Sequence, residues 1–508
     1  MEEYVLGGLG ASADAVVAGL GPLAEGLARL AGQACRAVTL DEAEALVAVQ
    51  GRELLRGLLQ LCLDVQAAAE VRVPAVTGAD GVRRARAERG HARTVTTVLG
   101  KVSVRRIAYR SGVRGAGSLF PRDAVLGLPA CGYSWQLQRL AEMFSRHGSY
   151  EQARGLLLAA TGVSVGKRQL QQVTARAAAD AGQFAGDRAG QAGQEGGCLL
   201  PLVISADGKG VAMRPEARRG RSVAPGQRKR NFEHRRGTGE KGHKRMAEAG
   251  CVLDVQVPPG PPRTPEQVMA GGPGSGQGAP AAVNRWYACD IIAGRDVTVA
   301  RLFDEAERRD PGRLRRWIAL VDGDTRQLRL TEAQAAARGA AVTVVIDFVH
   351  VLEYLWKAAW CFHAPRDPAM EDWVTAQGLD ILHGRARQVT ARIRQLAEDH
   401  PPQGTEHAKV IRKTLHYLEA KQPYMDYPAA LASGWPIATG VIEGACRHLV
   451  QDRMGITGAR WGLHGAQAIL SLRAIAASGD TSAYWDYHIR QEHQRNHLSR
   501  YADYQLAT

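Results

Sequence analysis

Three acidic side chains stand where they could share a divalent cation. Asp207 follows the apolar run "PLVIS", Asp322 follows "WIALV", and each precedes a glycine. We expect each aspartate at the end of a buried strand, with the two strands side by side in one sheet. The carboxylates would then converge despite the 115 residues between them (322 minus 207). Two converged carboxylates repel unless a cation lies between them or one stays protonated. The pair therefore predicts a divalent-metal site, with an acid of raised pKa as the alternative.

Glu443 would supply the third ligand. In "GWPIATGVIEGACRHLVQDRM", Thr439 or Gly440 can begin a helix, and Glu443 then falls in its first turn. Taken singly, Asp-Gly pairs are usually turns and a glutamate at a helix start is usually a cap. Together, two strand acids and one helix acid fit two Mg²⁺ ions about 3.5 to 4 Å apart for in-line phosphoryl transfer. One ion would activate the attacking hydroxyl, and the other would stabilise the leaving 3′ oxygen.

The order of the expected elements tells which fold would position these acids. The order strand, strand, strand, helix, strand, helix, strand predicts an α/β core, a ribonuclease H-like mixed sheet flanked by helices. We expect this catalytic core at 198–355, and a helical region at 356–508 that completes it with Glu443. The expected strands are 199–213, 247–257, 285–292, 316–324 and 342–351, and the helices are 296–309 and 325–340.

Two long connections interrupt the core. Residues 214–245 hold 12 Lys or Arg against 3 Glu, a net charge of +9. Such a run is usually a solvated loop, but its place directly after the strand of Asp207 favours a clamp on the DNA backbone. The loop at 258–284 is rich in Pro and Gly and carries no candidate site. The DNA contacts expected from the basic loop are Arg228, Lys229, Arg230, Arg235 and Arg236.

The N-terminal region, 1–90, is mainly helical by its spacing of Ala and Leu. One stripe of it, with Leu54, Leu55, Leu58, Leu61 and Val65, predicts packing rather than chemistry.

The segment 92–110 alternates β-branched and polar residues on both sides of "LGK" and predicts a β-hairpin. Its Arg105, Arg106 and Arg110 would either touch phosphates or defend a solvated edge strand.

A second DNA-binding candidate follows within the region 91–185. Ser149 can cap one helix, Gly162 can end it, and "KRQLQQVTARAA" restarts the helical pattern. The spacing resembles a helix-turn-helix, whose second helix would bring Lys167 and Arg168 toward DNA. Any two helices joined by a glycine turn look similar, so the alternative is a plain helical pair.

Composition limits the partners and the compartment. The 508 residues carry 65 Lys and Arg against 51 Asp and Glu, which leaves a net charge of +14 and favours a polyanionic partner. The eight cysteines are scattered without a CxxC pair, as in a reducing compartment. The acidic start "MEEYVLGGLG" is unlike a signal peptide, and no apolar run is long enough for a membrane span. We expect a cytoplasmic protein.

Four segments carry a resemblance to a known family. "VISADGKGVAMRPE", "VVIDFVHVLEYLWKAA", "GWPIATGVIEGACRHLVQDRMGITGARW" and "YSWQLQRLAEMFSRHGSYEQA" resemble the ISKra-type insertion-sequence transposases, bacterial enzymes with a DDE catalytic triad. The resemblance runs from about residue 90 to the C-terminus. It implies the triad Asp207, Asp322 and Glu443, with Mg²⁺ replaceable by Mn²⁺. It also implies double-stranded DNA as substrate, both inverted-repeat ends and target, and at least a dimer on DNA in the bacterial nucleoid.

The resemblance leaves a choice for the second acid. In Mutator-like relatives the second catalytic Asp belongs to an Asp-Gly pair, and a Cys- or Asp-x-x-His motif follows it. Asp347 and His350 follow Asp322 by 25 and 28 residues and resemble that accessory motif. We prefer Asp322, with Asp347 as the alternative. His350 would orient its strand or contact the scissile phosphate, or form a structural pair with Asp347.

Basic and aromatic residues after Glu443 are candidates for holding transposon-end DNA. They are Arg447, Arg453, Arg460 and Trp461.

The function predicted from all of this is a DNA transposase. The alternatives are a nuclease of the same fold that cuts without joining, and a non-catalytic DNA-binding protein derived from a transposase.

Overall fold

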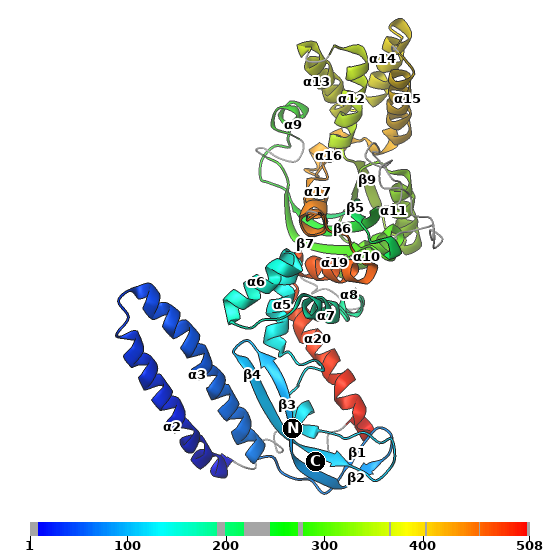
Figure 1. Ribbon diagram of the computed structural model, residues 1–508. Helices are drawn as coiled ribbons and strands as arrows, with labels where there is room; N and C mark the ends of the chain where they lie inside the picture. Colours follow the sequence, from blue (N-terminus) through cyan, green and yellow to red (C-terminus); the bar gives the residue numbers. More distant parts are fainter. Residues whose placement is uncertain are drawn as a thin grey trace, which may run out of the picture. The chain divides into compact units, whose positions relative to one another are not determined.

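The computed structural model describes residues 9–189, 199–217, 244–272, 278–364, 367–401, 404–456 and 458–504. The chain divides into two compact units, Met1–Asp180 with Ser482–Thr508, and Ala181–Thr481 (Figure 1). The five basic residues expected to contact DNA in the loop, Arg228, Lys229, Arg230, Arg235 and Arg236, lie outside the described residues.

The second unit is built on a five-stranded mixed sheet of order β7-β6-β5-β8-β9. The central strand β5 runs parallel to β8, and β8 runs parallel to β9. On the other side β6 is antiparallel to both β5 and β7. The prediction of an α/β core with five strands in this chain order is confirmed. The strands are β5 (Leu202–Ala212), β6 (Lys244–Gln256), β7 (Ala281–Asp290), β8 (Trp317–Val321) and β9 (Val342–Ile346).

Helices cover both faces of this sheet (Figure 1). Because successive side chains of a strand point to opposite faces, Leu202 and Ile204 of β5 pack with α10 (Arg295–Arg309) and α11 (Thr325–Arg338). Val203 packs on the opposite face, which α17 (Gly440–Ala445) and α19 (Leu463–Ala477) cover. Asp207 has the same parity as Val203. Its side chain therefore belongs to the face that α17 covers.

A group of helices separates β9 from α17 in the sequence. Figure 1 shows them side by side at one end of the second unit, beyond the sheet. They pack through an apolar core that includes Leu355 and Ile381 and continues into the α17 face of the sheet. The members are α12 (Phe348–Phe362), α13 (Pro368–Leu382), α14 (Ala386–Asp399) and α15 (Gly404–Lys421), and α16 (Tyr427–Ala432) leads back to α17.

The other elements of the second unit are short. They include α8 (Ala181–Ala189), α9 (Pro265–Gly271), α18 (Asp452–Met454) and a π-helical turn at Cys446–Gln451 that continues α17.

The first unit contains the expected β-hairpin. Strands β3 (Arg86–Thr97) and β4 (Gly100–Arg110) pair in antiparallel register, with Thr97 opposite Gly100, so the hairpin prediction is confirmed. The helix α3 (Leu40–Ala68) lies against the hairpin, where its Leu59 and Leu63 pack on a small cluster of buried valines. The small strands β1 (Val76–Thr77) and β2 (Arg83–Arg84), the helix α4 (Pro121–Val125) and the long α20 (Thr481–Asn496) complete the unit.

Three helices of the first unit contain the helix-turn-helix-like segment. They are α5 (Trp135–His147), α6 (Tyr150–Thr161) and α7 (Lys167–Ala177), and they share one apolar core. Ser149 caps α6 in a reciprocal capping box with Gln152, and Gly162 ends it with a φ of 70°. Both end signals read from the sequence are therefore confirmed.

The longest helices in the described part of the chain, α2 (Leu9–Ala34) and α3, form a hairpin with each other. No helix among the described residues is both long and apolar enough to cross a membrane.

Candidate active site

Asp207 lies in the middle of β5, not at its end as expected. The strand runs on to Ala212 because β6 pairs with it along its whole length, up to Ala212 opposite Lys244. The neighbour on the other side, β8, stops pairing at Ser205. One edge of β5 is therefore free of β8 at the level of Asp207, which leaves space for the carboxylate. Its Oδ1 accepts a hydrogen bond of 2.6 Å from the amide of Gly208.

Asp322 directly follows β8, as the sequence predicts. Its Oδ1 accepts a hydrogen bond of 2.8 Å from the amide of Asp324, and its carbonyl oxygen accepts one of 3.0 Å from the hydroxyl of Tyr417. Burial raises the pKa of Asp322, the amide of Asp324 and the charge of His350 lower it, and the negative charge of Asp207 raises it by a smaller amount. The charge of Asp207 therefore acts on Asp322, whereas the convergence of the two carboxylates at one ion stays a prediction.

Glu443 extends from the helix that covers the same face of the sheet. The helix α17 begins at Gly440 with Thr439 as its N-cap, as predicted, and Glu443 is exposed in its first turn. One turn further on, burial raises the pKa of the Cys446 thiol, and the neighbouring Asp207 carboxylate raises it further. Asp207 therefore faces the helix that carries Glu443.

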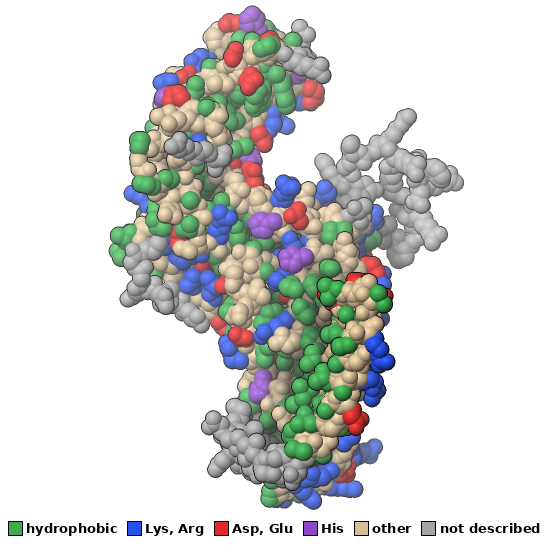
Figure 2. Space-filling view, turned by 90° about the vertical axis from the view of Figure 1, so that its left-hand side faces the viewer, with side chains coloured by type: hydrophobic (Ala, Val, Ile, Leu, Met, Phe, Trp, Pro, Cys, Tyr) green, Lys and Arg blue, Asp and Glu red, His purple; other side chains and the backbone are tan. Residues whose placement is uncertain are grey.

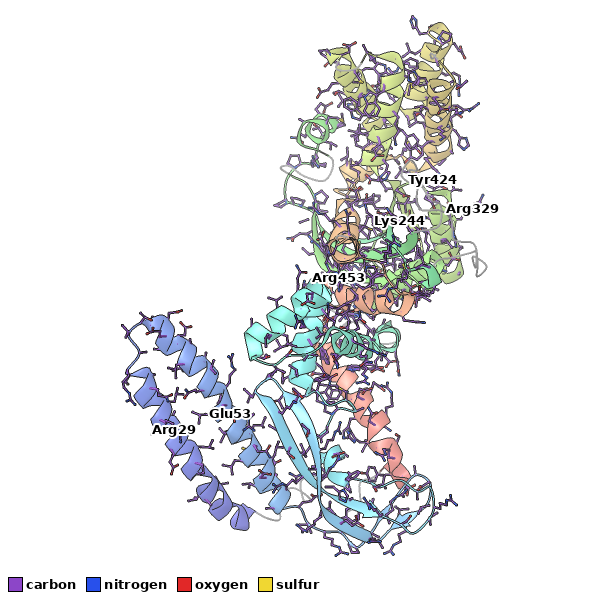
Figure 3. The ribbon with its side chains drawn as sticks, viewed as in Figure 1. Arg29, Glu53, Lys244, Arg329, Tyr424 and Arg453 are labelled. Atoms are coloured by element: carbon purple, nitrogen blue, oxygen red, sulfur yellow. The ribbon has the colours of Figure 1, made fainter. Side chains whose placement is uncertain are left out.

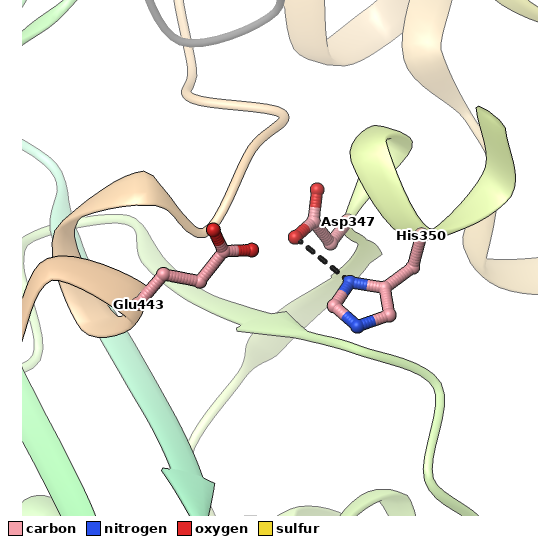
Figure 4. Close-up of side chains that lie close together, drawn as sticks. All are labelled: Asp347, His350 and Glu443. Atoms are coloured by element: carbon pink, nitrogen blue, oxygen red, sulfur yellow. Dashed lines mark hydrogen bonds and ion pairs between the residues drawn. The ribbon is translucent and has the colours of Figure 1, made fainter. Parts of the chain in front are cut away.

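Among the described residues, one group of side chains could hold a metal ion with all its ligand atoms within 4.8 Å of one another. It consists of Asp347, His350 and Glu443 (Figure 4). Figure 4 shows the Glu443 carboxylate directed from α17 toward the other two, which lie at the start of α12. The structure thus brings Glu443 together with the alternative second acid, and Asp207 and Asp322 are outside this group.

Asp347 and His350 stand on a helix and not on a strand. The prediction that the strand extends to residue 351 is wrong, because β9 ends at Ile346 and Asp347 is the N-cap of α12. The carboxylate of an aspartate at this position accepts a hydrogen bond from a backbone N–H of the first turn, which has no partner within the helix. His350 consequently lies in the first turn of α12.

The carboxylate of Asp347 is fully buried and fully used within the protein. Its Oδ1 accepts a hydrogen bond of 2.8 Å from the amide of Val349. Its Oδ2 lies 3.1 Å from Nδ1 of His350 and accepts a hydrogen bond from the hydroxyl of Thr439. With 0% of its surface exposed and both oxygens engaged, Asp347 is suited to hold its neighbours in place.

The sequence pattern alone does not identify Thr439 as a functional residue. Its hydroxyl makes no capping hydrogen bond to α17. Instead it contacts Asp347 and lies 3.1 Å from Oε1 of Glu443. The only signal in the sequence is a threonine four residues before the acid at a helix start, which is ordinary for a cap.

His350 is a cation at neutral pH. The hydrogen bond with Asp347 raises the pKa of His350 to about 9, and the charges of Asp347 and Asp322 add to the rise. A positive charge therefore lies beside the acids, within reach of an anionic substrate.

A pocket of about 320 Å³ lies between the sheet and α17. Val203, Ser205 and Leu253 line it from the sheet, and Thr439 and Gly440 line it from the helix. The face of α17 opposite to solvent is therefore incompletely packed near Glu443.

Two of the four DNA-binding candidates after Glu443 are buried. Arg453, labelled in Figure 3, is 2% exposed, and Trp461 is 7% exposed. The guanidinium of Arg453 lies 4.7 Å from the centre of the Trp461 ring. Trp461 also extends the sheet, since its amide donates a hydrogen bond to the carbonyl of Ala212. The expectation that these two hold DNA does not fit their burial, because the stack anchors the helix end to β5. Arg447 and Arg460 are exposed and stay candidates.

The DNA-binding candidates in the first unit also include both exposed residues and one with a structural role. Lys167 and Arg168 are exposed at the start of α7, and the ammonium of Lys167 forms an ion pair of 2.8 Å with Glu151. Arg105 is exposed on the hairpin. Arg106 instead pairs with Asp123 and stacks 4.1 Å from the centre of the Phe120 ring, a structural role.

The donor atoms of Asp207, Asp322 and Glu443 are of a type that suits a magnesium ion, although they do not all lie within 4.8 Å of one another. All are carboxylate oxygens, the ligand type that Mg²⁺ prefers. Within the described part of the chain, Oδ2 of Asp322 and Oε2 of Glu443 accept no hydrogen bond and are available as ligands. A comparison with models of protein families found no match for this chain, and no curated protein matches it significantly.

Proposed function

We propose that the protein is a DNA transposase that cleaves and joins transposon-end DNA by magnesium-dependent phosphoryl transfer. One observation carries the proposal. Asp207 and Asp322 come from neighbouring parallel strands, the charge of Asp207 contributes to the raised pKa of Asp322, and Asp207 faces the helix that carries Glu443. Like charges near one another in a folded chain are unfavourable without a cation. The charge of His350 offsets part of this repulsion at Asp322, and a bound Mg²⁺ would offset the rest.

The sheet supports the same proposal. The chain order of its strands and their spatial order, β7-β6-β5-β8-β9, are those expected of a ribonuclease H-like core. In that arrangement the first and fourth strands are neighbours, as β5 and β8 are here. The resemblance of the segments around Asp207 and Glu443 to ISKra-type transposases adds the reaction class.

Each acid then has a role. Asp207, Asp322 and Glu443 would hold Mg²⁺, which when bound supplies charge stabilisation for a phosphoryl group and its attacking and leaving oxygens. The imidazolium of His350 would donate a hydrogen bond from Nε2 to an oxygen of the scissile phosphate. Asp347 would hold His350 through Nδ1 and, through Thr439, would position Glu443. Asp347 is therefore a positioning residue in this proposal, and Asp322 is the second acid of the triad.

The test is an end-joining assay. Labelled duplexes that carry the inverted repeats read from the DNA flanking the gene are incubated with the protein, Mg²⁺ and a plasmid target. Joined products that disappear in Asp207→Asn, while the variant still binds the duplex, support the proposal. Cleavage without joining supports the nuclease alternative, and binding without any cleavage supports a DNA-binding protein that has lost its activity.

A further inference from the structure

The hairpin of α2 and α3 carries an apolar surface that no described part of the chain covers. On α3, Val47, Leu55 and Leu58 are 47%, 52% and 43% exposed, and Cys62 follows them at the same helical spacing. With Gly51 these residues form one stripe, spaced four, four, three and four apart, which we name the α3 stripe. Figure 2 shows apolar side chains gathered over the face of this hairpin that is turned to the viewer.

The other faces of α3 already have partners within the chain. Leu54 and Leu61 reach Gly26 and Gly19 of α2, and Leu59 and Leu63 pack against the β-hairpin. An apolar stripe on a helix normally packs against another element. The α3 stripe is therefore a third packing face.

The glycines of this hairpin show how its helices pack. A Cβ built on Gly19 would lie 2.1 Å from Leu61, and one on Gly26 would lie 2.6 Å from Leu54. One on Gly57 would lie 3.0 Å from Leu23. In each case a leucine of one helix enters the space above a glycine of the other.

Gly51 offers the same space with nothing in it. Apart from its chain neighbours and the backbone of its own helix, no described atom lies within 4 Å of a Cβ built on Gly51. Glycine is the least favourable residue in a helix interior apart from proline, so a glycine here needs a packing partner to explain it. The exposed Leu55 stands one turn away on the same stripe.

We propose that the α3 stripe is the interface between two copies of this chain. Leu55 is a knob and Gly51 is a hole on one helix, four residues apart. A twofold axis near residue 53 with antiparallel α3 helices puts each Leu55 over Gly51 of the other copy, and each Leu58 over Ala48. A surface that carries both halves of its own contact is self-complementary, as an isologous dimer requires.

The charge of the hairpin excludes one class of occupant, and its area allows a second copy. Residues 9–68 hold seven Asp and Glu against four Arg, a net charge of −3 in a chain of +14. That excess of acid disfavours nucleic acid on this hairpin. Two helices of 26 and 29 residues make a face about 40 Å long and about 20 Å wide. The face of both helices is roughly 800 Å² per copy, which is the area of a standard stable interface and the upper limit for a contact centred on the α3 stripe.

The test is the association state of the full chain without DNA or metal, by sedimentation over a concentration series. We expect a dimer, and we expect Leu55→Glu with Leu58→Glu to weaken it about hundredfold or more, because two buried leucines are lost. Leu156→Glu is the matched control, since Leu156 is 51% exposed on α6 of the same unit and should leave the dimer intact. Circular dichroism should be unchanged in all variants, because each replaced side chain is exposed in one copy.

A second variant separates a fitted interface from unspecific association. Gly51→Leu adds apolar surface and would tighten unspecific association, whereas it fills the hole and weakens the proposed dimer. A monomeric wild-type chain, or a dimer unaffected by the double glutamate variant, would overturn the proposal. The Asp207→Asn variant should dimerise like the wild type, so the outcome does not depend on the proposed catalytic site.

Discussion

The hydroxyl of Thr439 joins Asp347 to Glu443, two acids 96 residues apart in the chain (443 minus 347). One of these acids is fully buried at a helix start, and the other is exposed at the candidate active site. The hydroxyl has one proton and two carboxylates within reach. It can donate to one of them at a time, and its oxygen lies within hydrogen-bond distance of both, so the position of the exposed acid is tied to that of the buried one.

We expect Thr439→Val to lower the free energy of unfolding by about 1–3 kcal/mol, since the buried Asp347 loses a hydrogen-bond donor. Chemical denaturation of the full chain measures this. Thr439→Ser keeps the hydroxyl and should stay within about 0.5 kcal/mol of the wild type. Equal losses in both variants would mean that the methyl packing of Thr439 matters and the bridge does not.

The variant Asp322→Asn should lose magnesium-dependent cleavage without losing stability. The pKa of Asp322 is raised in the folded chain, so the charged form is disfavoured there, and a neutral side chain should raise the free energy of unfolding at pH 7 by up to about 1 kcal/mol. Asn keeps the acceptor for the amide of Asp324. The readouts are denaturation and cleavage of labelled duplex.

Asp347→Asn is the counterpart that tests the choice of second acid. Because both oxygens of Asp347 are used inside the protein, this variant should lower the free energy of unfolding by about 1–3 kcal/mol. A stable but inactive Asp347→Asn beside an active Asp322→Asn would reverse our assignment.

Stability should depend on pH through His350. Its folded-state pKa of about 9 lies above the value in an unfolded chain, about 6.5. The contribution of His350 to the free energy of unfolding is therefore complete below pH about 6.5 and is lost as the pH rises through about 9. We expect wild type to exceed His350→Gln by about 1–3 kcal/mol at pH 6, a value discounted for the partial exposure of the ring. Denaturation in a chelating buffer at pH 6 and above pH 9 measures the difference. If the difference in free energy of unfolding between wild type and His350→Gln does not decrease at high pH, the charged state assigned to His350 is wrong.

The basic loop should govern the salt dependence of DNA binding. Lys244 pairs with Ala212, so residues 218–243 can be replaced by a short Gly-Ser turn between paired strands. Those residues hold nine Lys and Arg against two Glu. We expect weaker binding to duplexes of any sequence and a plot of log K against log salt that is shallower by several units. Fluorescence anisotropy measures this, and a loop of equal length with Gln for Lys and Arg is the control. An unchanged slope would remove the loop from the DNA-binding surface.

Local signals in the sequence were sufficient for much of the fold. The capping box of Ser149 and the left-handed Gly162 were recognised, since each acts within a few residues. The strand order was recognised because buried strands are continuous apolar runs. The end of β9 was misjudged, because "VTVVIDFVHV" is apolar on both sides of Asp347 and only the capping hydrogen bond separates strand from helix.

The contacts that define the site could not be read in this way. The link from Thr439 to Asp347 spans 92 residues, and a threonine before a helix predicts only a cap. The same limit applies to α3. Leu54, Leu55, Leu58 and Leu61 look alike in the sequence, yet Leu54 and Leu61 are packed on α2 while Leu55 and Leu58 are exposed. Periodicity predicts an apolar side chain and does not tell which partner meets it.

Asp207 and Glu443 are held with unequal firmness, because Asp207 lies in the middle of a paired strand. Its backbone is fastened by a ladder that continues for five residues beyond it, to Ala212, so the sheet is a fixed platform. Glu443 belongs to a six-residue helix that lies beside a pocket of about 320 Å³. A displacement of α17 toward the sheet, into this pocket, would bring Glu443 nearer to Asp207 and would break the contact between Thr439 and Asp347.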